Sequence, residues 1–194
     1  MPHIDESTRL ILIPAGKTDW ADQRRVQGDM DLPLNEEGIT QAQQWSSELA
    51  GSGISVLYCG TTGPTRETAE RIGKALKLKP KHDEELDEVN LGLWQGMRVE
   101  EIQQKHPSVF KLWMHRPEQV EPPSGESLGT GRDRVERAIE RIVQKNRPKS
   151  VGIVLGRISF ALVIAHREGG QPGRVWEILK QSFGWKELPL DLMQ

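Results

Sequence analysis

The sequence predicts an α/β fold, a three-layer αβα sandwich built around a mostly parallel sheet. Three short apolar runs, Leu10–Ile13, Ile54–Cys59 and Ser150–Leu155, have the length of buried strands. Each run is followed by a segment with helical signals, and strands that alternate with helices build parallel sheets. Such sheets bind ligands at the carboxyl ends of their strands, so the loops that follow the three runs are the expected place for a site.

Local signals place the helices. Asp31–Leu34 should be extended, because Pro33 disfavours a helical conformation at the residue before it. Asn35 can then cap a helix with an acidic first turn, and Gly51 ends that helix. Apolar spacing predicts further helical segments over residues 67–76, 99–105, 132–146 and 158–165, with another turn beginning at residue 107. Residues 86–96 and 121–125 are expected to be loops, whereas residues 174–181 fit either a helix or a strand.

Composition excludes several classes of protein. The 194 residues include 36% hydrophobic and 28% charged residues, which is enough apolar material for a core in one domain spanning residues 1–194. A net charge of -2 leaves no basic excess for nucleic acid. The longest apolar run, Ile158–Ala165, is too short for a membrane span, and the charged N-terminal segment does not resemble a secretory signal. We therefore expect a soluble cytoplasmic protein without nucleic-acid or membrane partners.

Metal and disulfide chemistry are not expected. Cys59 is the single cysteine of the sequence, so an internal disulfide or a cysteine metal cluster cannot form. The histidines show no spacing typical of metal ligands. No metal and no cofactor are predicted.

Four short motifs occur in a characteristic order. They are Arg25–Gly28 (Arg-Val-Gln-Gly), Asp31–Leu34 (Asp-Leu-Pro-Leu), Gly92–Gly96 (Gly-Leu-Trp-Gln-Gly) and Gly125–Ser127 (Gly-Glu-Ser). With these motifs the chain resembles the histidine phosphatase superfamily, also called phosphoglycerate-mutase-like, over roughly residues 8–165. The resemblance implies the αβα fold and a reaction in which one histidine takes the phosphoryl group. It also implies that a second histidine and two arginines surround the phosphate while a glutamate protonates the leaving group.

The resemblance places the family's catalytic positions on residues of a different chemical kind. The two histidine positions correspond to Ala15 and Leu155, and the two arginine positions to Pro14 and Pro64. Among these groups the acid alone is retained, as Glu88. Loss of the nucleophile closes the covalent route, and loss of one strong donor to a developing oxyanion typically costs roughly 10²–10³ in rate. The family reaction is therefore predicted to be absent.

The leading hypothesis is a catalytically inactive histidine-phosphatase-like protein, a pseudophosphatase, that binds a protein partner or a small ligand through a more apolar pocket. The alternative is a phosphatase or phosphoglycerate-mutase-type enzyme whose altered site uses Glu88, Cys59 or relocated cations. The resemblance also predicts a lid-like insertion over about residues 97–130, which contains Trp113. A homo-oligomer is compatible with both hypotheses. The candidate ligand-binding residues are Gly16, Lys17, Arg25, Gln27, Gly28, Gly156 and Arg157.

Two candidate catalytic residues also have structural interpretations. Glu88 is either an acid or base for some reaction or a cap that accepts hydrogen bonds from backbone N–H groups, and we favour the cap. Cys59 would need a nearby histidine or lysine to act as a nucleophile. No histidine lies near it in the sequence, so an inert cysteine is expected.

Overall fold

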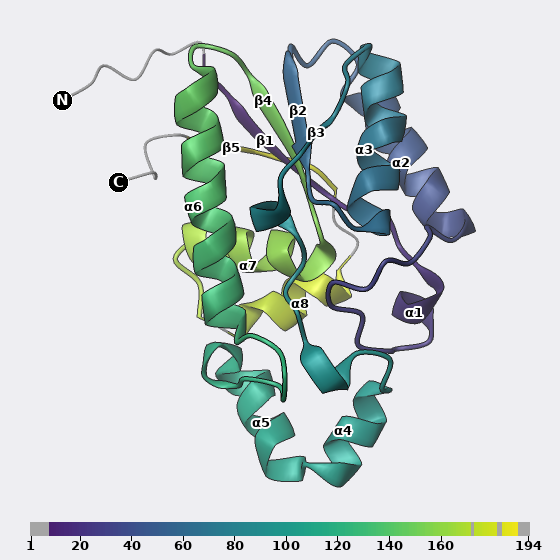
Figure 1. The fold of residues 1–194 in the computed structure, drawn as a ribbon, viewed down its shortest axis with the longest axis vertical. Coiled ribbons are helices and arrows are strands. Elements are labelled where there is room, and N and C mark those ends of the chain that lie inside the picture. Colours follow the sequence, from purple (N-terminus) through teal and green to yellow (C-terminus); the bar gives the residue numbers. More distant parts are fainter. Residues whose placement is uncertain (1–7, 172, 182–183, 190–194) are drawn as a thin grey trace, which may run out of the picture.

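A five-stranded sheet organises the protein, and the computed structural model describes residues 8–171, 173–181 and 184–189 of the chain. The strand order is β3-β2-β4-β1-β5 (Figure 1). The four strands β3, β2, β4 and β1 are parallel to one another, and β5 pairs antiparallel with β1. The strands are β1 (Leu10–Pro14), β2 (Val56–Cys59), β3 (Lys81–His82), β4 (Val151–Leu155) and β5 (Lys186–Leu188).

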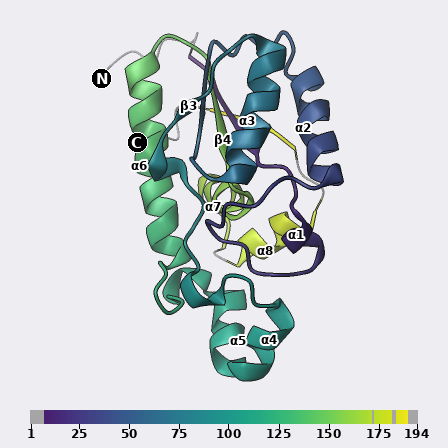
Figure 2. The same cartoon turned by 45° about the vertical axis from the view of Figure 1, so that its right-hand side comes forward.

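Helices cover both faces of this sheet and complete the predicted three layers. Alternation along β1 sends Ile11 and Ile13 into a cluster with α2 and α3, whereas Leu10 and Leu12 enter a cluster with α6 and α7. Figures 1 and 2 show α2 and α3 together on one side of the sheet and α6 on the other. These four helices are α2 (Glu36–Glu48), α3 (Gly63–Leu76), α6 (Leu128–Asn146) and α7 (Arg157–Arg167).

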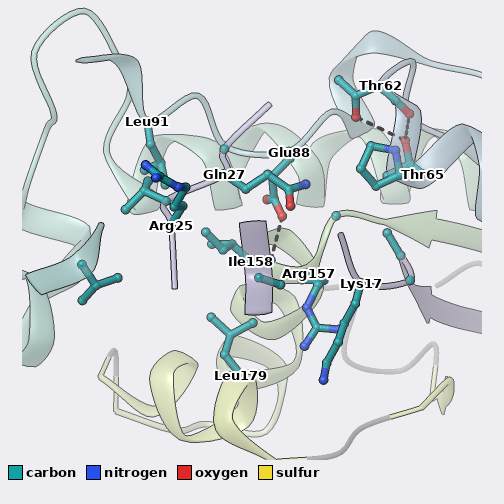
Figure 3. A pocket seen from close by; sticks show the side chains of 18 of the residues that line it. Lys17, Arg25, Gln27, Thr62, Thr65, Glu88, Leu91, Arg157, Ile158 and Leu179 are labelled. Carbon is teal, nitrogen blue, oxygen red and sulfur yellow. Dashed lines mark hydrogen bonds between the residues drawn. The ribbon is translucent and has the colours of Figure 1, made fainter. Parts of the chain in front are cut away.

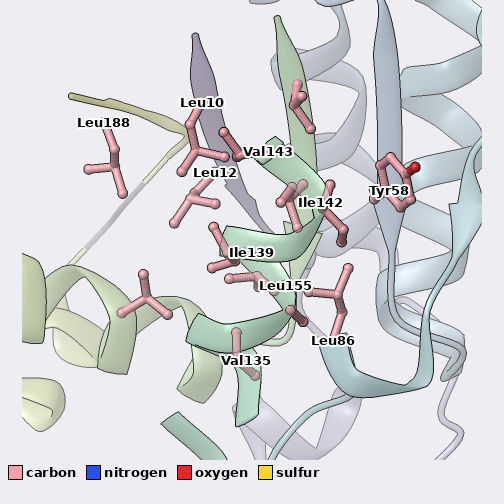
Figure 4. Packing of buried hydrophobic residues seen from close by; sticks show 14 of the residues in the cluster. Leu10, Leu12, Tyr58, Leu86, Val135, Ile139, Ile142, Val143, Leu155 and Leu188 are labelled. Atoms are coloured by element: carbon pink, nitrogen blue, oxygen red, sulfur yellow. The ribbon is translucent and has the colours of Figure 1, made fainter. Parts of the chain in front are cut away.

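The cluster between the sheet and α6 is the largest of the three apolar clusters in the described residues. Figure 4 shows Val135, Ile139 and Ile142 of α6 packed toward Leu12 and Leu155 of the strands. All five side chains are 0–2% exposed. The apolar spacing that predicted this helix therefore identified its buried face correctly, and burial of that face against the sheet stabilises both layers.

Shorter helices surround the carboxyl edge of the sheet. α4 and α5 project at the end of the molecule away from the N-terminus, and α1 and α8 lie nearer the sheet (Figures 1 and 2). Their bounds are α1 (Asp19–Asp22), α4 (Val99–Lys105), α5 (Pro107–His115) and α8 (Arg174–Lys180). Three 3₁₀ turns lie among them: η1 (Glu84–Leu86), η2 (Gly92–Trp94) and η3 (Pro117–Gln119).

Several boundaries differ from the prediction. α3 begins at Gly63 rather than at residue 67, because Pro64 fits the first turn of a helix, where its missing N–H costs nothing. α6 begins at Leu128 rather than at residue 132, and Ser127 caps it by accepting a hydrogen bond from Thr130. Residues 174–181, which fitted either a helix or a strand, form the helix α8 over Arg174–Lys180. α1, β3 and β5 were not predicted, since each is four residues or shorter.

The described residues contain no helix that is both long enough and apolar enough to cross a bilayer. The prediction of one domain over residues 1–194 stays a prediction, as does the lid-like role of residues 97–130.

Candidate functional site

A cavity of about 340 Å³ opens at the carboxyl ends of the strands, within the size range of small-molecule sites. Ala15–Lys17 follow β1, Thr62 and Pro64 follow β2, and Gly156–Ile158 follow β4, and all of them line it. The three loops that the sequence singled out therefore meet at one place. Residues from the segments 21–28 and 88–99 and from α5 and α8 complete the lining (Figure 3).

All seven candidate ligand-binding residues lie on the cavity wall. They are Gly16, Lys17, Arg25, Gln27, Gly28, Gly156 and Arg157. Their position agrees with the sequence analysis, although ligand binding by these residues stays a prediction.

Of the four substituted positions inferred from the resemblance, Ala15 and Pro64 line the cavity. Pro14 and Leu155 do not, and this corrects the expectation that they form part of the pocket. The two residues are paired in register between β1 and β4, and Leu155 belongs to the cluster under α6. Because side chains alternate along a strand, the next residues, Ala15 and Gly156, face the cavity instead.

Gly156 therefore takes the place that the sequence analysis gave to Leu155. Ala15 donates its backbone N–H to the carbonyl of Leu155 at 2.7 Å, which brings Ala15 and Gly156 alongside each other. A Cβ atom on residue 156 would lie 2.4 Å from Oε2 of Glu88. Residue 156 thus has no room for a side chain while Glu88 keeps this position.

Glu88 caps the N-terminus of α7. Its Oε2 accepts a hydrogen bond from the Ile158 N–H at 2.7 Å. Its Oε1 accepts from the Ser159 N–H at 2.8 Å, the Ser159 hydroxyl at 2.6 Å and the Val89 N–H at 2.9 Å. Figure 3 shows the bond to Ile158. The interpretation of Glu88 as a backbone cap is confirmed, with a helix end as the capped element.

Burial dominates the acidity of Glu88. The residue is 6% exposed, and desolvation raises the pKa of its carboxyl group above the ordinary value. The hydrogen bonds from Ser159, Val89 and Ile158 favour the charged form and offset part of this rise. All four of these bonds come from groups of the protein itself.

Lys17 and Arg25 are engaged within the chain. Nζ of Lys17 lies 2.6 Å from a carboxylate oxygen of Glu37 and 3.9 Å from one of Asp22. Arg25 donates from its guanidinium to the carbonyl of Gly96 at 2.5 Å. Both cations therefore already have partners within the protein.

Arg157 is a partly buried cation on the cavity wall. Burial lowers the pKa of its guanidinium, while the charges of Glu37, Glu88 and Asp22 oppose that shift. Figure 3 draws Arg157 and Lys17 on the same side of the cavity. Two of the acids that attract Arg157, Glu37 and Asp22, are those that pair with Lys17, so the two cations share their counter-charges.

Another part of the wall is built by aromatic side chains. Trp113 of α5 is 3% exposed, and its ring meets that of Trp176 of α8 edge to face, with centroids 4.5 Å apart. Trp176 donates its indole N–H to the backbone carbonyl of Trp113 at 2.9 Å. Trp113 also contacts the rings of Trp94 and Phe110. Trp113 is thus both a core residue and a residue of the cavity wall.

Histidine is absent from the cavity wall over the described part of the chain. His82, His106, His115 and His166 are all exposed, and none of them lines the cavity. In residues 8–171, 173–181 and 184–189, no group of three or more His, Cys, Asp or Glu side chains is arranged to hold a metal ion.

Cys59 lies outside the cavity wall, and it is fully buried. Its Sγ is 3.4 Å from Nδ1 of His82, which is distant in the sequence but is brought close because β3 pairs with β2. Burial, with smaller contributions from Glu70 and Asp87, nevertheless raises the pKa of the thiol to about 12. The cysteine is therefore a thiol at neutral pH, and this supports the inert interpretation.

Comparison with known proteins decides the family. A model of the histidine phosphatase superfamily (branch 1) matches residues 10–189. The chain belongs to this superfamily. Phosphoserine phosphatase 1 of Hydrogenobacter thermophilus is 32% identical over 176 residues, which cover 91% of this chain and 81% of that protein. Phosphoglycerate mutase-like protein 4 of Arabidopsis thaliana is 32% identical over 75% of this chain and 64% of its own length.

Two solved structures share the fold of this chain. The structure named Bacillus stearothermophilus YhfR matches with a TM-score of 0.81 at 28% identity, over 91% of this chain and 86% of that one. A mycobacterial glucosyl-3-phosphoglycerate phosphatase in complex with VO3 matches with a TM-score of 0.80 at 24% identity, over 93% and 92% of the two chains. The fold expected from the sequence is thereby confirmed.

Proposed function

We propose that this protein is a pseudophosphatase, a histidine phosphatase superfamily member that binds a small ligand in its cavity and does not transfer phosphoryl groups. The observation that carries the proposal is the absence of imidazole from the cavity wall in the described residues, with Ala15 at the expected nucleophile position. A methyl group has no lone pair with which to attack phosphorus, so the phosphohistidine intermediate has no place to form.

The charges of the site support the same proposal. A phosphate dianion would have to compete with Glu37 and Asp22 for Lys17, and it would meet the buried carboxyl group of Glu88. Phosphoryl transfer depends on cations and donors already aimed at the phosphate oxygens. Here those groups are already engaged by the protein.

The position of Glu88 adds a third argument. A general acid for a leaving group must bring its proton within hydrogen-bond reach of the substrate. Both carboxylate oxygens of Glu88 accept hydrogen bonds at the start of α7 instead. This arrangement favours a structural role for the residue.

The alternative is an active phosphatase or mutase with an altered site. Two observations favour it: a relative named phosphoserine phosphatase 1, and the presence of Lys17, Arg25 and Arg157 on the cavity wall. In that case the cations would rearrange on substrate binding and Glu88 would leave its cap. A small ligand is preferred to a protein partner because the site is a cavity. A homo-oligomer and a cytoplasmic location stay predictions.

Phosphatase assays test the proposal. Release of phosphate from p-nitrophenyl phosphate and from phosphoserine would be measured between pH 5 and 9 for the wild type and Glu88→Gln. The relative from Hydrogenobacter thermophilus provides a positive control, and circular dichroism checks that the variant is folded. We expect both forms to release no more phosphate than buffer. Turnover by the wild type that Glu88→Gln lacks would contradict the proposal, and its loss in Arg157→Gln would support the altered enzyme.

A further inference from the structure

One part of the cavity wall carries a carboxyl group that the protein supplies itself. Glu88 is 6% exposed and lines the cavity together with Gly156 and Ile158 at the start of α7. Figure 3 shows the Glu88 carboxyl group hydrogen-bonded to Ile158. A buried carboxylate is costly to desolvate unless donors match its oxygens. The groups around Glu88 therefore show what this part of the wall is built to hold.

Three backbone N–H groups and one hydroxyl converge on the two oxygens of Glu88. Oε2 accepts from the N–H of Ile158 at 2.7 Å. Oε1 accepts from the N–H groups of Ser159 and Val89 at 2.8 and 2.9 Å and from the Ser159 hydroxyl at 2.6 Å. Backbone N–H groups donate hydrogen bonds and cannot accept them, so these contacts fit a carboxylate better than a neutral acid. The donors thus form a cradle for one anion.

The field at the same place also favours a negative charge. α7 has 11 residues, and the N-terminal end of a helix carries the positive end of its dipole and free N–H groups. Arg157 begins this helix, and the charge of Glu88 is one of those that favour its protonated guanidinium. The helix end and the neighbouring cation therefore stabilise an anion here, whether it belongs to the chain or to a ligand.

The cradle has no room for a second anion while Glu88 is in place. A Cβ atom added at residue 156 would collide with Oε2 of Glu88, so the space between this carboxyl group and the backbone is already filled. An external anion can reach the N–H groups of Ile158 and Ser159 only if the Glu88 side chain moves away, and that movement breaks four hydrogen bonds.

We propose that Glu88 is an internal plug, whose carboxylate occupies an anion-binding position at the start of α7 and keeps external anions away from the donors there. The plug is part of the chain, so its effective concentration is high and a free anion competes poorly with it. The inference goes beyond the proposed function, because it concerns anion binding and holds whether or not the cavity transfers phosphoryl groups. Any ligand of the cavity then binds without the N–H groups of Ile158 and Ser159.

Acetate rescue of Glu88→Ala tests the plug. The substitution deletes the Cγ atom and the carboxylate, and acetate consists of the same heavy atoms. Urea denaturation, followed by tryptophan fluorescence at pH 8, would be compared in about 0.2 M sodium acetate and in about 0.2 M acetamide with equal sodium chloride. We expect the unfolding equilibrium constant of Glu88→Ala to be about 10-fold smaller in acetate, as a Kd of about 20 mM predicts. The wild type should change by less than about 2-fold.

NMR locates the bound acetate. The amide resonances of Ile158 and Ser159 should shift when acetate is added to Glu88→Ala, because acetate then accepts their hydrogen bonds. The same resonances of the wild type should not move, since Glu88 already holds these donors.

Two further variants serve as matched controls. Glu88→Gln removes the charge but keeps the side chain, so the space stays filled and acetate should stabilise it no more than acetamide does. Leu155→Ala removes a fully buried side chain from the aliphatic cluster under α6 and exposes no comparable set of donors. It reports any general effect of acetate on a destabilised variant.

Each outcome supports or overturns the plug. Equal stabilisation of Glu88→Ala and Leu155→Ala by acetate would show a general salt effect and overturn it, as would acetate-induced shifts of Ile158 and Ser159 in the wild type. If Glu88→Ala is unfolded without additives, recovery of native fluorescence in acetate but not in acetamide supports the plug. Absence of any acetate effect on Glu88→Ala overturns it. Acetate carries no phosphoryl group, so all of these results are independent of the phosphatase assays that test the proposed function.

Discussion

Leu155 and Gly156 are consecutive residues with opposite surroundings, and they mark the border between the core and the cavity. Leu155 ends β4 and is fully buried among aliphatic side chains under α6. Gly156 begins the loop to α7, lines the cavity and leaves space that the Glu88 carboxyl group fills. The sheet is therefore specified by apolar packing, whereas the cavity is specified by a few polar contacts and by the absence of side chains.

A substitution at the core residue Leu155 should cause the largest loss of stability. Leu155→Ala leaves a cavity among fully buried residues, and we expect the free energy of unfolding to fall by about 3 kcal/mol. Chemical denaturation monitored by circular dichroism measures it. Leu93→Ala is the control, because Leu93 is 68% exposed and its truncation should change stability by less than about 0.5 kcal/mol. Equal losses in the two variants would contradict the comparison.

The space that Gly156 leaves for Glu88 in the cavity can be tested by substituting Gly156. Gly156→Ala should cost about 2 kcal/mol, because its Cβ displaces Glu88 and breaks the cap of α7. Backbone strain is not the cause, since φ at this residue is −55°, which alanine adopts freely. In a Glu88→Ala background the same change should cost much less. A double-mutant cycle measures the difference, and additive losses would show that the two residues do not compete for space.

The pH dependence of stability sharpens the comparison further. The pKa of Glu88 is raised in the folded protein, so the folded state binds its proton more tightly than the unfolded state. The resulting stabilisation is fully present below the ordinary pKa of about 4.3 and is lost as the pH rises through the raised value. The stability of the wild type minus that of Glu88→Gln should therefore fall as the pH rises from about 4. Denaturant titrations from pH 4 to 8 measure this difference, and a difference that rises with pH would indicate a lowered pKa.

The smallest effect is expected at the cavity rim. Lys17→Met removes an ion pair with Glu37 whose two side chains are 28% and 50% exposed, and it should cost no more than about 0.5 kcal/mol. The loss should vanish in 1 M NaCl, where exposed charges are screened. A cost as large as that of Leu155→Ala would mean that the rim contributes as much to stability as the core.

Much of the fold was predictable because its signals are local and apolar. The runs that became β1, β2 and β4 are uninterrupted, and the spacing of Val135 and Ile139 marks the buried face of α6. β3 and β5 escaped prediction because their two or three residues carry no periodicity and pair only through contacts distant in sequence. The same limitation hid the proximity of His82 to Cys59.

The candidate site was predictable in its location but less so in its detail. Loops after parallel strands converge by topology, which is why all seven candidate binding residues line the cavity. Leu155 was placed there wrongly, because a one-residue shift at the end of a strand turns a side chain from one face of the sheet to the other. The alternation of side chains along β4 could have indicated that Leu155 faces the core, together with Val151 and Ile153. No signal in the sequence could have indicated that the buried indole N–H of Trp113 lacks a hydrogen-bond partner, because that is visible only in three dimensions.

The shared space of Glu88 and residue 156 also limits how this sequence can change. A single codon change that introduced a bulky ring at residue 156 would collide with the carboxyl group before it could serve any reaction. Any substitution that adds a side chain at residue 156 would first have to free the carboxyl group of Glu88 from the start of α7, and the resulting protein would fold less stably. The cap formed by Glu88 therefore restricts residue 156 to glycine.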